Sequence, residues 1–152
     1  MGKVGILMGS VSDQSFVDDT VKVLEDLGVD YEVRVISAHR NPAGVMEYAT
    51  SAKDRGIQVL IGVAGGSAAL PGVLASWTNL PVIGVPVPSS DLNGIDSLTA
   101  IAQMPPGIPV ACVAIGSWGA RNAAYLAAQI IGLNDKSIAD AYSAYREKLR
   151  GK

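Results

Sequence analysis

The chain has a single histidine, His39, and acid–base chemistry at neutral pH would depend on this residue. Its imidazole can both accept and donate a proton under those conditions. Arg40 follows directly and offers a permanent positive charge with a forked set of donors, which suits a phosphate or a carboxylate. The two side chains therefore place a proton carrier next to an anion-binding group. The alternative is an ordinary histidine on a solvent-exposed loop.

Residues 9–13 (GSVSD) are typical of a phosphate-binding loop at the start of a helix. The hydroxyls of Ser10 and Ser12, with the free backbone N–H groups of a first helical turn, suit a phosphate dianion. Asp13 would repel that phosphate, so we expect its carboxylate to bind ribose hydroxyls instead. A Ser/Asp helix cap without a ligand is the alternative.

Residues 64–72 (AGGSAALPG) contain two adjacent glycines, Gly65 and Gly66. Because neither has a Cβ, the backbone there can approach a flat ligand closely. A tight turn from a strand into a helix explains the pair equally well. We expect Ser67 in this segment, and Ser37 two residues before His39, to contact the same substrate.

Each of these polar segments follows a short apolar run that is typical of a buried strand. We predict strands over residues 4–8, 31–36, 59–63, 82–85 and 110–115. Helices are predicted over residues 13–27 with Ser12 as the cap, 42–55 with Asn41 as the cap, 67–77, 95–103, 119–132 and 135–149. This alternation predicts a three-layer α/β sandwich with a parallel, flavodoxin-like or Rossmann-like sheet. Ligands bind at the carboxyl ends of such strands, where the polar segments would meet.

The predicted last helix carries an apolar stripe at helical spacing, made of Ile138, Ala141, Tyr142, Tyr145 and Leu149. Packing of this stripe within the chain and packing against a neighbouring subunit both explain the pattern.

The composition indicates one domain over residues 1–152 that covers part of its surface in a homo-oligomer. Hydrophobic residues make up 49% of the chain and charged residues 17%, against a typical charged share of about 25%. The net charge of −2 and the scattered Lys and Arg residues argue against nucleic acid as a partner. One cysteine, Cys112 inside an apolar run, fits a cytoplasmic protein. We find no signal peptide and no apolar stretch of the roughly 18 residues that a membrane span needs, so we expect a soluble protein.

Several common functions lack their motifs in this sequence. It has neither the G-x-G-x-x-G of dinucleotide-binding folds nor a P-loop. One histidine, one cysteine and no clustered carboxylates argue against a metal site. The residues alone predict a site for a phosphorylated small molecule with one acid–base group. From another class, a non-catalytic flavodoxin-like module for flavin or nucleotide remains, although an aromatic share of 5% is low for a stacked flavin.

Nearly end to end, the chain resembles the 5-(carboxyamino)imidazole ribonucleotide mutase family of purine biosynthesis. The matching segments are residues 8–13 (MGSVSD), 37–40 (SAHR), 64–66 (AGG) with 70–72 (LPG), 94–98 (GIDSL) and 103–110 (QMPPGIPV). The resemblance implies that Ser10, Asp13 and Arg40 hold a ribonucleotide and that His39 is the acid–base residue. It also implies a cytoplasmic homo-octamer that needs no metal or organic cofactor.

The resemblance implies a reaction in which a carboxylate moves from the exocyclic nitrogen of an aminoimidazole ribonucleotide to ring carbon C4, on the way to IMP. His39 would protonate the nitrogen, releasing CO2 into a closed pocket. The ring carbon would attack the trapped CO2, and His39 would then remove the C4 proton.

One position departs from the family pattern. Bacterial mutases usually read AAHLPG where this chain reads SAALPG, so the second family histidine is replaced by Ala69. Ser67 and residues 88–91 (PSSD) look like the related branch, phosphoribosylaminoimidazole carboxylase, which uses free CO2 directly. Arg40 and residues 96–98 and 103–105 look like the mutase branch, which we favour.

Overall fold

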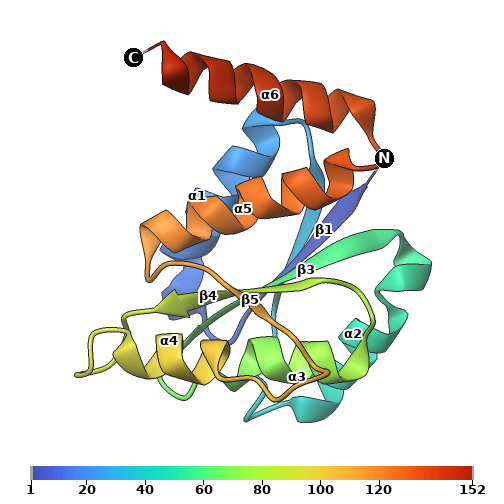
Figure 1. Ribbon diagram of the computed structural model, residues 1–152. Coiled ribbons are helices and arrows are strands. Elements are labelled where there is room, and N and C mark those ends of the chain that lie inside the picture. The colour runs from blue at the N-terminus through green and yellow to red at the C-terminus, as the bar shows by residue number, and fades with distance from the viewer. Residues whose placement is uncertain (1, 152) are drawn as a thin grey trace.

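At the centre of the molecule is a sheet of five parallel strands in the order β2-β1-β3-β4-β5. The computed structural model describes residues 2–151, and Figure 1 shows the sheet between two layers of helices. The strands are β1 (Lys3–Met8), β2 (Asp30–Val35), β3 (Ile57–Gly65), β4 (Val82–Val87) and β5 (Ala111–Cys112). This order is the flavodoxin-like one, and it confirms the predicted fold class.

The helices divide between the two faces of the sheet (Figure 1). One face is covered by α1 (Gln14–Asp26) and α5 (Ser117–Gly132), and α6 (Lys136–Arg150) packs on α5. The other face is covered by α2 (Pro42–Ser51), α3 (Ala69–Trp77) and α4 (Ile95–Ala102). Two short 3-10 helices, η1 (Val11–Asp13) and η2 (Lys53–Arg55), lie in the connections.

β1 contributes to two separate cores because successive side chains of a strand point to opposite faces. Val4, Ile6 and Met8 join the core beneath α1 and α5, whereas Leu7 joins the core beneath α2 and α3. The sheet-facing side of α5 consists of small residues that let the helix lie close to the strands: Ala120, Ala123, Ala124, Ala127 and Ala128.

Of the two predicted helix caps, one is confirmed by the structure and the other is wrong. Asn41 caps α2 as predicted, since its Oδ1 accepts a hydrogen bond from the Gly44 N–H at 3.0 Å. The prediction of Ser12 as the cap of the first long helix is wrong. Ser10 instead caps η1 by accepting a hydrogen bond from the Ser12 N–H at 3.3 Å, and α1 begins only at Gln14, without a side-chain cap.

β5 is much shorter than the predicted strand over residues 110–115. Val113 donates its N–H to the Gly84 carbonyl at 3.1 Å, and Gly116 donates to the Pro86 carbonyl at 2.9 Å. The donors are three residues apart where the acceptors in β4 are two apart, so a regular ladder cannot continue. Pro86 also has no N–H to return to this edge.

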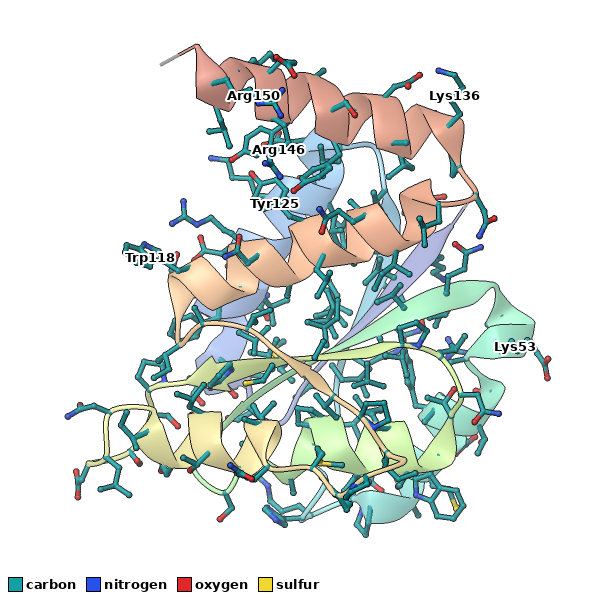
Figure 2. All side chains as sticks on the ribbon, in the orientation of Figure 1. Lys53, Trp118, Tyr125, Lys136, Arg146 and Arg150 are labelled. Atoms are coloured by element: carbon teal, nitrogen blue, oxygen red, sulfur yellow. The ribbon has the colours of Figure 1, made fainter. Side chains whose placement is uncertain are left out.

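The apolar stripe of α6 packs within the chain over most of its length. Ile138 is buried, and the Tyr145 ring stacks on Tyr125 of α5 with ring centroids 4.6 Å apart. Figure 2 shows Tyr125 between α5 and α6. Tyr142 also contacts Tyr125, at a centroid distance of 5.9 Å. Leu149, at the far end of the stripe, remains 45% exposed. Intrachain packing therefore accounts for most of the stripe.

Candidate active site

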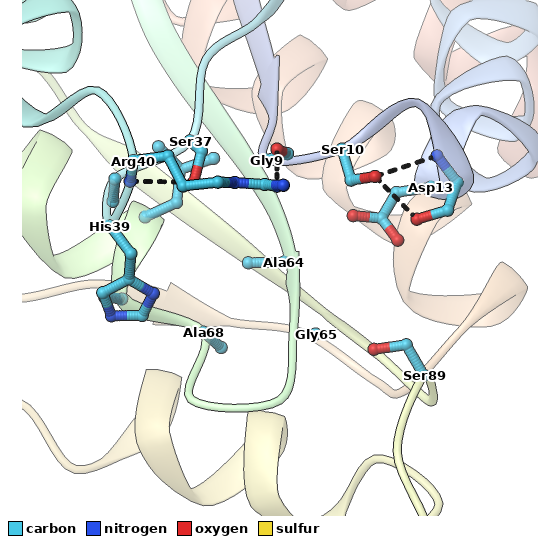
Figure 3. Close-up of a pocket in the computed structure, with 14 residues that line it drawn as sticks. Gly9, Ser10, Asp13, Ser37, His39, Arg40, Ala64, Gly65, Ala68 and Ser89 are labelled. Atoms are coloured by element: carbon cyan, nitrogen blue, oxygen red, sulfur yellow. Dashed lines mark hydrogen bonds between the residues drawn. The ribbon is translucent and has the colours of Figure 1, made fainter.

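A cavity of about 190 Å³ lies where β1, β2, β3 and β4 end (Figure 3). Its walls come from the loops that follow these four strands. β1 and β3 are neighbours in the sheet, although β2 comes between them in the chain. In flavodoxin-like sheets this reversal of strand order between β1 and β3 is the place where ligands bind.

Seven of the nine predicted site residues line this one cavity: His39, Ser10, Ser12, Asp13, Ser37, Arg40 and Gly65. Gly66 and Ser67 do not. Gly66 and Ala68 have positive φ angles of 58° and 40°, and these turn the chain away into α3. α3 accordingly begins at Ala69 rather than at residue 67, and Ser67 is exposed.

Arg40 reaches from the β2 loop across to the β1 loop (Figure 3). Its Nη2 donates a hydrogen bond to the Gly9 carbonyl at 3.0 Å, and its Nε donates to Ser37 Oγ at 3.2 Å. The Arg40 backbone N–H also donates to Ser37 Oγ, at 3.3 Å. A guanidinium has five N–H donors, so three remain for an anion in the cavity.

Asp13 is a carboxylate with little contact to water, because its residue is only 6% exposed. This burial raises the pKa of Asp13, and a hydrogen bond from Ser12 lowers it by less. A buried carboxylate is stabilised by groups that donate hydrogen bonds to it. Hydroxyls of a bound ligand would provide such donors.

His39 lies at one side of the cavity, and Ser10 and Asp13 lie at the other (Figure 3). The side chain is exposed, so a ligand in the cavity can exchange a proton with it. An acid–base group, a cation and a set of hydroxyls around one hollow suit proton transfer on a small anionic molecule that carries hydroxyl groups.

Sequence reasoning assigned no role to seven other lining residues, which are Gly9, Ala38, Ala64, Ala68, Ala69, Leu70 and Ser89. Six of them are glycine, alanine or leucine, whose side chains carry no polar or titratable group. They shape the cavity through the position of their backbone. Ser89 is the exception. Its place two residues after β4 was a signal in the sequence, since the other site loops also follow strands.

Among residues 2–151, no three or more His, Cys, Asp or Glu side chains gather in a way that could hold a metal ion. No helix in this described range is both long and apolar enough to span a membrane.

Comparison with known proteins gives a consistent set of relatives. A family model described as AIR carboxylase matches residues 3–152. An N5-carboxyaminoimidazole ribonucleotide mutase from Saccharolobus solfataricus is 53% identical over 150 residues, which are 99% of this chain and 94% of that protein. A mutase of the same name from Pyrococcus abyssi is 55% identical over 150 residues, covering 99% of this chain and 85% of that protein.

Solved structures agree with this result. PurE from Treponema denticola superposes with a TM-score of 0.88 at 33% identity, covering 99% of this chain and 93% of that one. A 3-dehydroquinate dehydratase-like protein from Bifidobacterium longum superposes with a TM-score of 0.56 at 17% identity. The second likeness extends to the fold alone.

Proposed function

The chain belongs to the AIR carboxylase family, and from this membership we propose that it is an N5-carboxyaminoimidazole ribonucleotide mutase. Such an enzyme is an isomerase of purine biosynthesis that converts N5-carboxyaminoimidazole ribonucleotide into 4-carboxy-5-aminoimidazole ribonucleotide. The observation that carries the proposal is the 53% identity with a mutase across 99% of the chain.

We assign a role to each predicted residue that lines the cavity. Ser10, Ser12 and the free donors of Arg40 bind the phosphate, and Asp13 accepts hydrogen bonds from the ribose. Ser37 contacts Arg40 directly, so its contribution is to hold the guanidinium as well as to border the substrate. Gly65 borders the imidazole ring of the substrate, with Gly66 and Ser67 in the adjoining turn.

His39 carries out both proton transfers. Protonated His39 donates its proton to the exocyclic nitrogen as the N–C bond to the carboxylate breaks, which yields an amine and CO2. C4 of the neutral aminoimidazole then attacks CO2 and forms the new C–C bond. His39 removes the proton from C4, which restores the aromatic ring and the protonated imidazole. One side chain used in this way contributes a rate factor of about 10² to 10⁴.

Retention of CO2 is the second requirement of this mechanism. A ribonucleotide bound in the cavity, whose volume is about 190 Å³, would have to hold CO2 between its own C4 and the cavity wall. A reactant held in place reacts at a high effective concentration, whereas its escape would end the turnover.

Ala69 is relevant to a second candidate reaction, the direct carboxylation of an aminoimidazole ribonucleotide by free CO2. It lines the cavity at the position where the resemblance leads us to expect a histidine, so His39 would be the one imidazole available. A carboxylase that takes up free CO2 would need the same cavity and the same base. The distinction therefore lies in which substrate is accepted.

The test is to supply each ribonucleotide separately, with and without bicarbonate. We expect N5-carboxyaminoimidazole ribonucleotide to be converted in the absence of added bicarbonate, and 5-aminoimidazole ribonucleotide with bicarbonate to react far more slowly. Faster conversion of the second pair would assign the carboxylase reaction. If the protein converts neither substrate, it has neither the mutase nor the carboxylase activity, and the proposed function is wrong.

We expect His39→Asn to lower kcat by at least 10²-fold, because asparagine keeps a polar side chain of similar reach but cannot carry the proton. Binding of 5-aminoimidazole ribonucleotide, measured by calorimetry, should change little. Near-normal turnover in this variant would exclude His39 as the acid–base residue.

A further inference from the structure

Ser89 is a cavity residue to which the proposed mechanism gives no role. It follows β4 by two residues and lines the cavity. Its backbone N–H donates to the Val87 carbonyl at 3.0 Å. Within residues 2–151, however, no hydrogen bond engages its hydroxyl, which is open to the cavity. The Ser89 hydroxyl can therefore donate a hydrogen bond to a ligand or accept one from it.

The segment that carries Ser89 is held firmly on both sides. Ser90 Oγ donates to Asp96 Oδ2 at 2.5 Å and accepts from the Leu92 N–H at 3.1 Å. The buried Ser97 hydroxyl lies 3.0 Å from the Val87 carbonyl and 3.1 Å from the Gly94 carbonyl. These contacts tie both ends of the segment to the start of α4. A fixed hydroxyl loses little freedom when it binds a ligand.

Gly65 leaves the space that the Ser89 hydroxyl occupies. A Cβ at residue 65 would lie 1.9 Å from Ser89 Oγ, which is far closer than real contacts allow. The absence of this Cβ therefore brings the β3 and β4 loops together at the floor of the cavity. As a result, the Ser89 hydroxyl stands beside backbone that the proposed substrate must touch.

The side of the cavity on which Ser89 lies indicates its ligand. Figure 3 shows Ser89 on the same side as Ser10 and Asp13, with His39 on the opposite side. The heterocycle must face His39, so the far side faces the sugar and the phosphate. Asp13 disfavours a phosphate oxygen close to it and favours hydroxyl groups.

We propose that the Ser89 hydroxyl binds a ribose hydroxyl of the substrate, opposite the Asp13 carboxylate. The two side chains come from the loops after β4 and β1 and would hold the sugar diol from two directions. This assignment rests on the proposed ribonucleotide substrate, and it makes Ser89 a residue that determines specificity for the sugar.

The test measures binding and turnover in Ser89→Ala. One neutral hydrogen bond contributes about a 3- to 10-fold change in affinity, so we expect Kd for 5-aminoimidazole ribonucleotide and KM to rise by that factor. kcat should stay within about twofold, because the contact is present before and during the reaction. The melting temperature should not change, since no hydrogen bond within residues 2–151 engages this hydroxyl.

Deoxyribose analogues make the assignment specific. The 2′-deoxy or the 3′-deoxy analogue of 5-aminoimidazole ribonucleotide should bind the unsubstituted protein about 3- to 10-fold more weakly than the ribose form. In Ser89→Ala this preference should disappear for the same analogue. An exposed serine on α6, Ser143, provides the control, because Ser143→Ala should change neither Kd nor the preference.

The outcomes separate this inference from the proposed function. If Ser89→Ala binds the ribonucleotide normally, or keeps the full preference for ribose, the inference is wrong while the mutase reaction stands. If the unsubstituted protein binds the ribonucleotide with the Ser89-dependent preference but converts neither substrate, the inference stands and the proposed function is wrong.

Discussion

Arg40 connects two loops of the cavity before any ligand binds. Its contacts with the Gly9 carbonyl and with Ser37 Oγ span from the β2 loop to the β1 loop. The same guanidinium would bind the substrate phosphate with its remaining donors. We therefore expect Arg40 to contribute to substrate binding in two ways. It contacts the substrate directly, and it holds the loop after β1 in position.

The variant Arg40→Lys should raise KM by about 10- to 100-fold, because lysine keeps the charge but cannot form the forked set of hydrogen bonds. kcat should fall far less than in His39→Asn. Steady-state kinetics of both variants would show this contrast. Arg34→Lys, on the exposed end of β2, is the matched control. Equal KM values for Arg40→Lys and Arg34→Lys would contradict the assignment.

Site residues could be predicted from the sequence where their chemistry is scarce. His39 is the one imidazole of the chain, and Ser10, Asp13 and Arg40 have side chains that suit a sugar phosphate. Ser89 follows a strand, as the other site residues do, but Ser90 beside it is also a serine, and only the structure shows that Ser89 is the one that lines the cavity. The alanines of the wall were not predictable, since their contribution is the path of the backbone.

Strands and helices could be predicted where the apolar pattern is continuous. All five strands and all six long helices were found at about the right places. The errors lie at element ends, where single contacts decide. Ser10 rather than Ser12 forms a cap, and β5 is cut short by the spacing of its partners in β4. Neither detail follows from a pattern of residue types.

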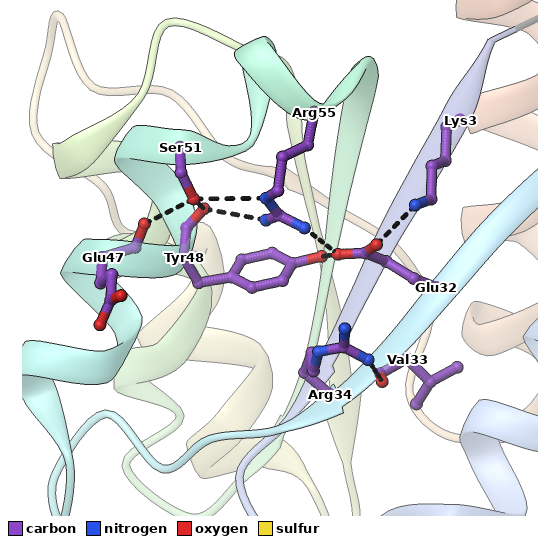
Figure 4. A network of polar contacts seen from close by, with 8 residues as sticks. All are labelled: Lys3, Glu32, Val33, Arg34, Glu47, Tyr48, Ser51 and Arg55. Carbon is purple, nitrogen blue, oxygen red and sulfur yellow. Dashed lines mark hydrogen bonds and ion pairs between the residues drawn. The ribbon is translucent and has the colours of Figure 1, made fainter.

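Glu32 of β2 contacts side chains from three other structural elements (Figure 4). It lies on β2 and forms ion pairs with Lys3 of β1, at 2.6 Å, and with Arg55 of η2. Tyr48 of α2 donates a hydrogen bond to it at 2.8 Å, and the Arg55 guanidinium lies over the Tyr48 ring. The carboxylate is only 13% exposed. Its charge therefore holds the edge strand β2 to β1, α2 and η2.

Acid should remove this contribution to stability. Burial alone would raise the pKa of Glu32, but hydrogen bonds from Lys3, Tyr48 and Arg55, with the charge of Arg55, lower it to about 2 from the ordinary 4.5. A lowered pKa stabilises the folded state above the ordinary value, and this contribution is lost as the pH falls from about 4.5 toward 2.

Glu32→Gln should therefore lower the free energy of unfolding at pH 7 by about 1 to 2 kcal/mol, and the variant should lose less stability than the unsubstituted protein below pH 4.5. Urea unfolding between pH 7 and pH 3 measures both effects. Glu147→Gln is the matched control, because Glu147 also pairs with an arginine, Arg150, but is 67% exposed. If the two variants have the same pH profile, the Glu32 network does not contribute as described.

Gly119 sets the position of α5 against the chain that enters it. A Cβ at this residue would lie 1.6 Å from the Ala114 carbonyl oxygen and 2.6 Å from its carbon. Both are backbone atoms, so rotation of a side chain cannot relieve the contact. Any larger residue must move the first turn of the helix.

We expect Gly119→Ala to lower the free energy of unfolding by about 3 kcal/mol or more, because overpacking against fixed backbone is costly. Thermal unfolding or the yield of folded protein would show the loss. Gly151→Ala is the control, since the nearest atom to a Cβ there is 3.9 Å away and its φ of −85° suits alanine. A Gly119→Ala protein as stable as this control would be incompatible with the packing of α5.

Several large apolar side chains are exposed on the surface of the single chain. Val11 is 71% exposed, Trp118 is 75% exposed and Leu133 is 82% exposed. Trp118 belongs to a hollow of about 210 Å³ that is also lined by Arg121, Tyr125 and Tyr145. We propose that contacts between copies cover such regions, in a homo-octamer.

Light scattering at micromolar concentration should then give a mass about eight times the 15.7 kDa of one chain. A buried tryptophan at an interface contributes about 2 kcal/mol or more to binding. If the hollow around Trp118 is such an interface, Trp118→Ser should shift the mass toward smaller species, while circular dichroism stays unchanged because the indole packs little within its own chain. A monomeric mass for the unsubstituted protein would contradict the octamer. The same mass for both proteins across a dilution series would place the subunit contacts elsewhere on the surface.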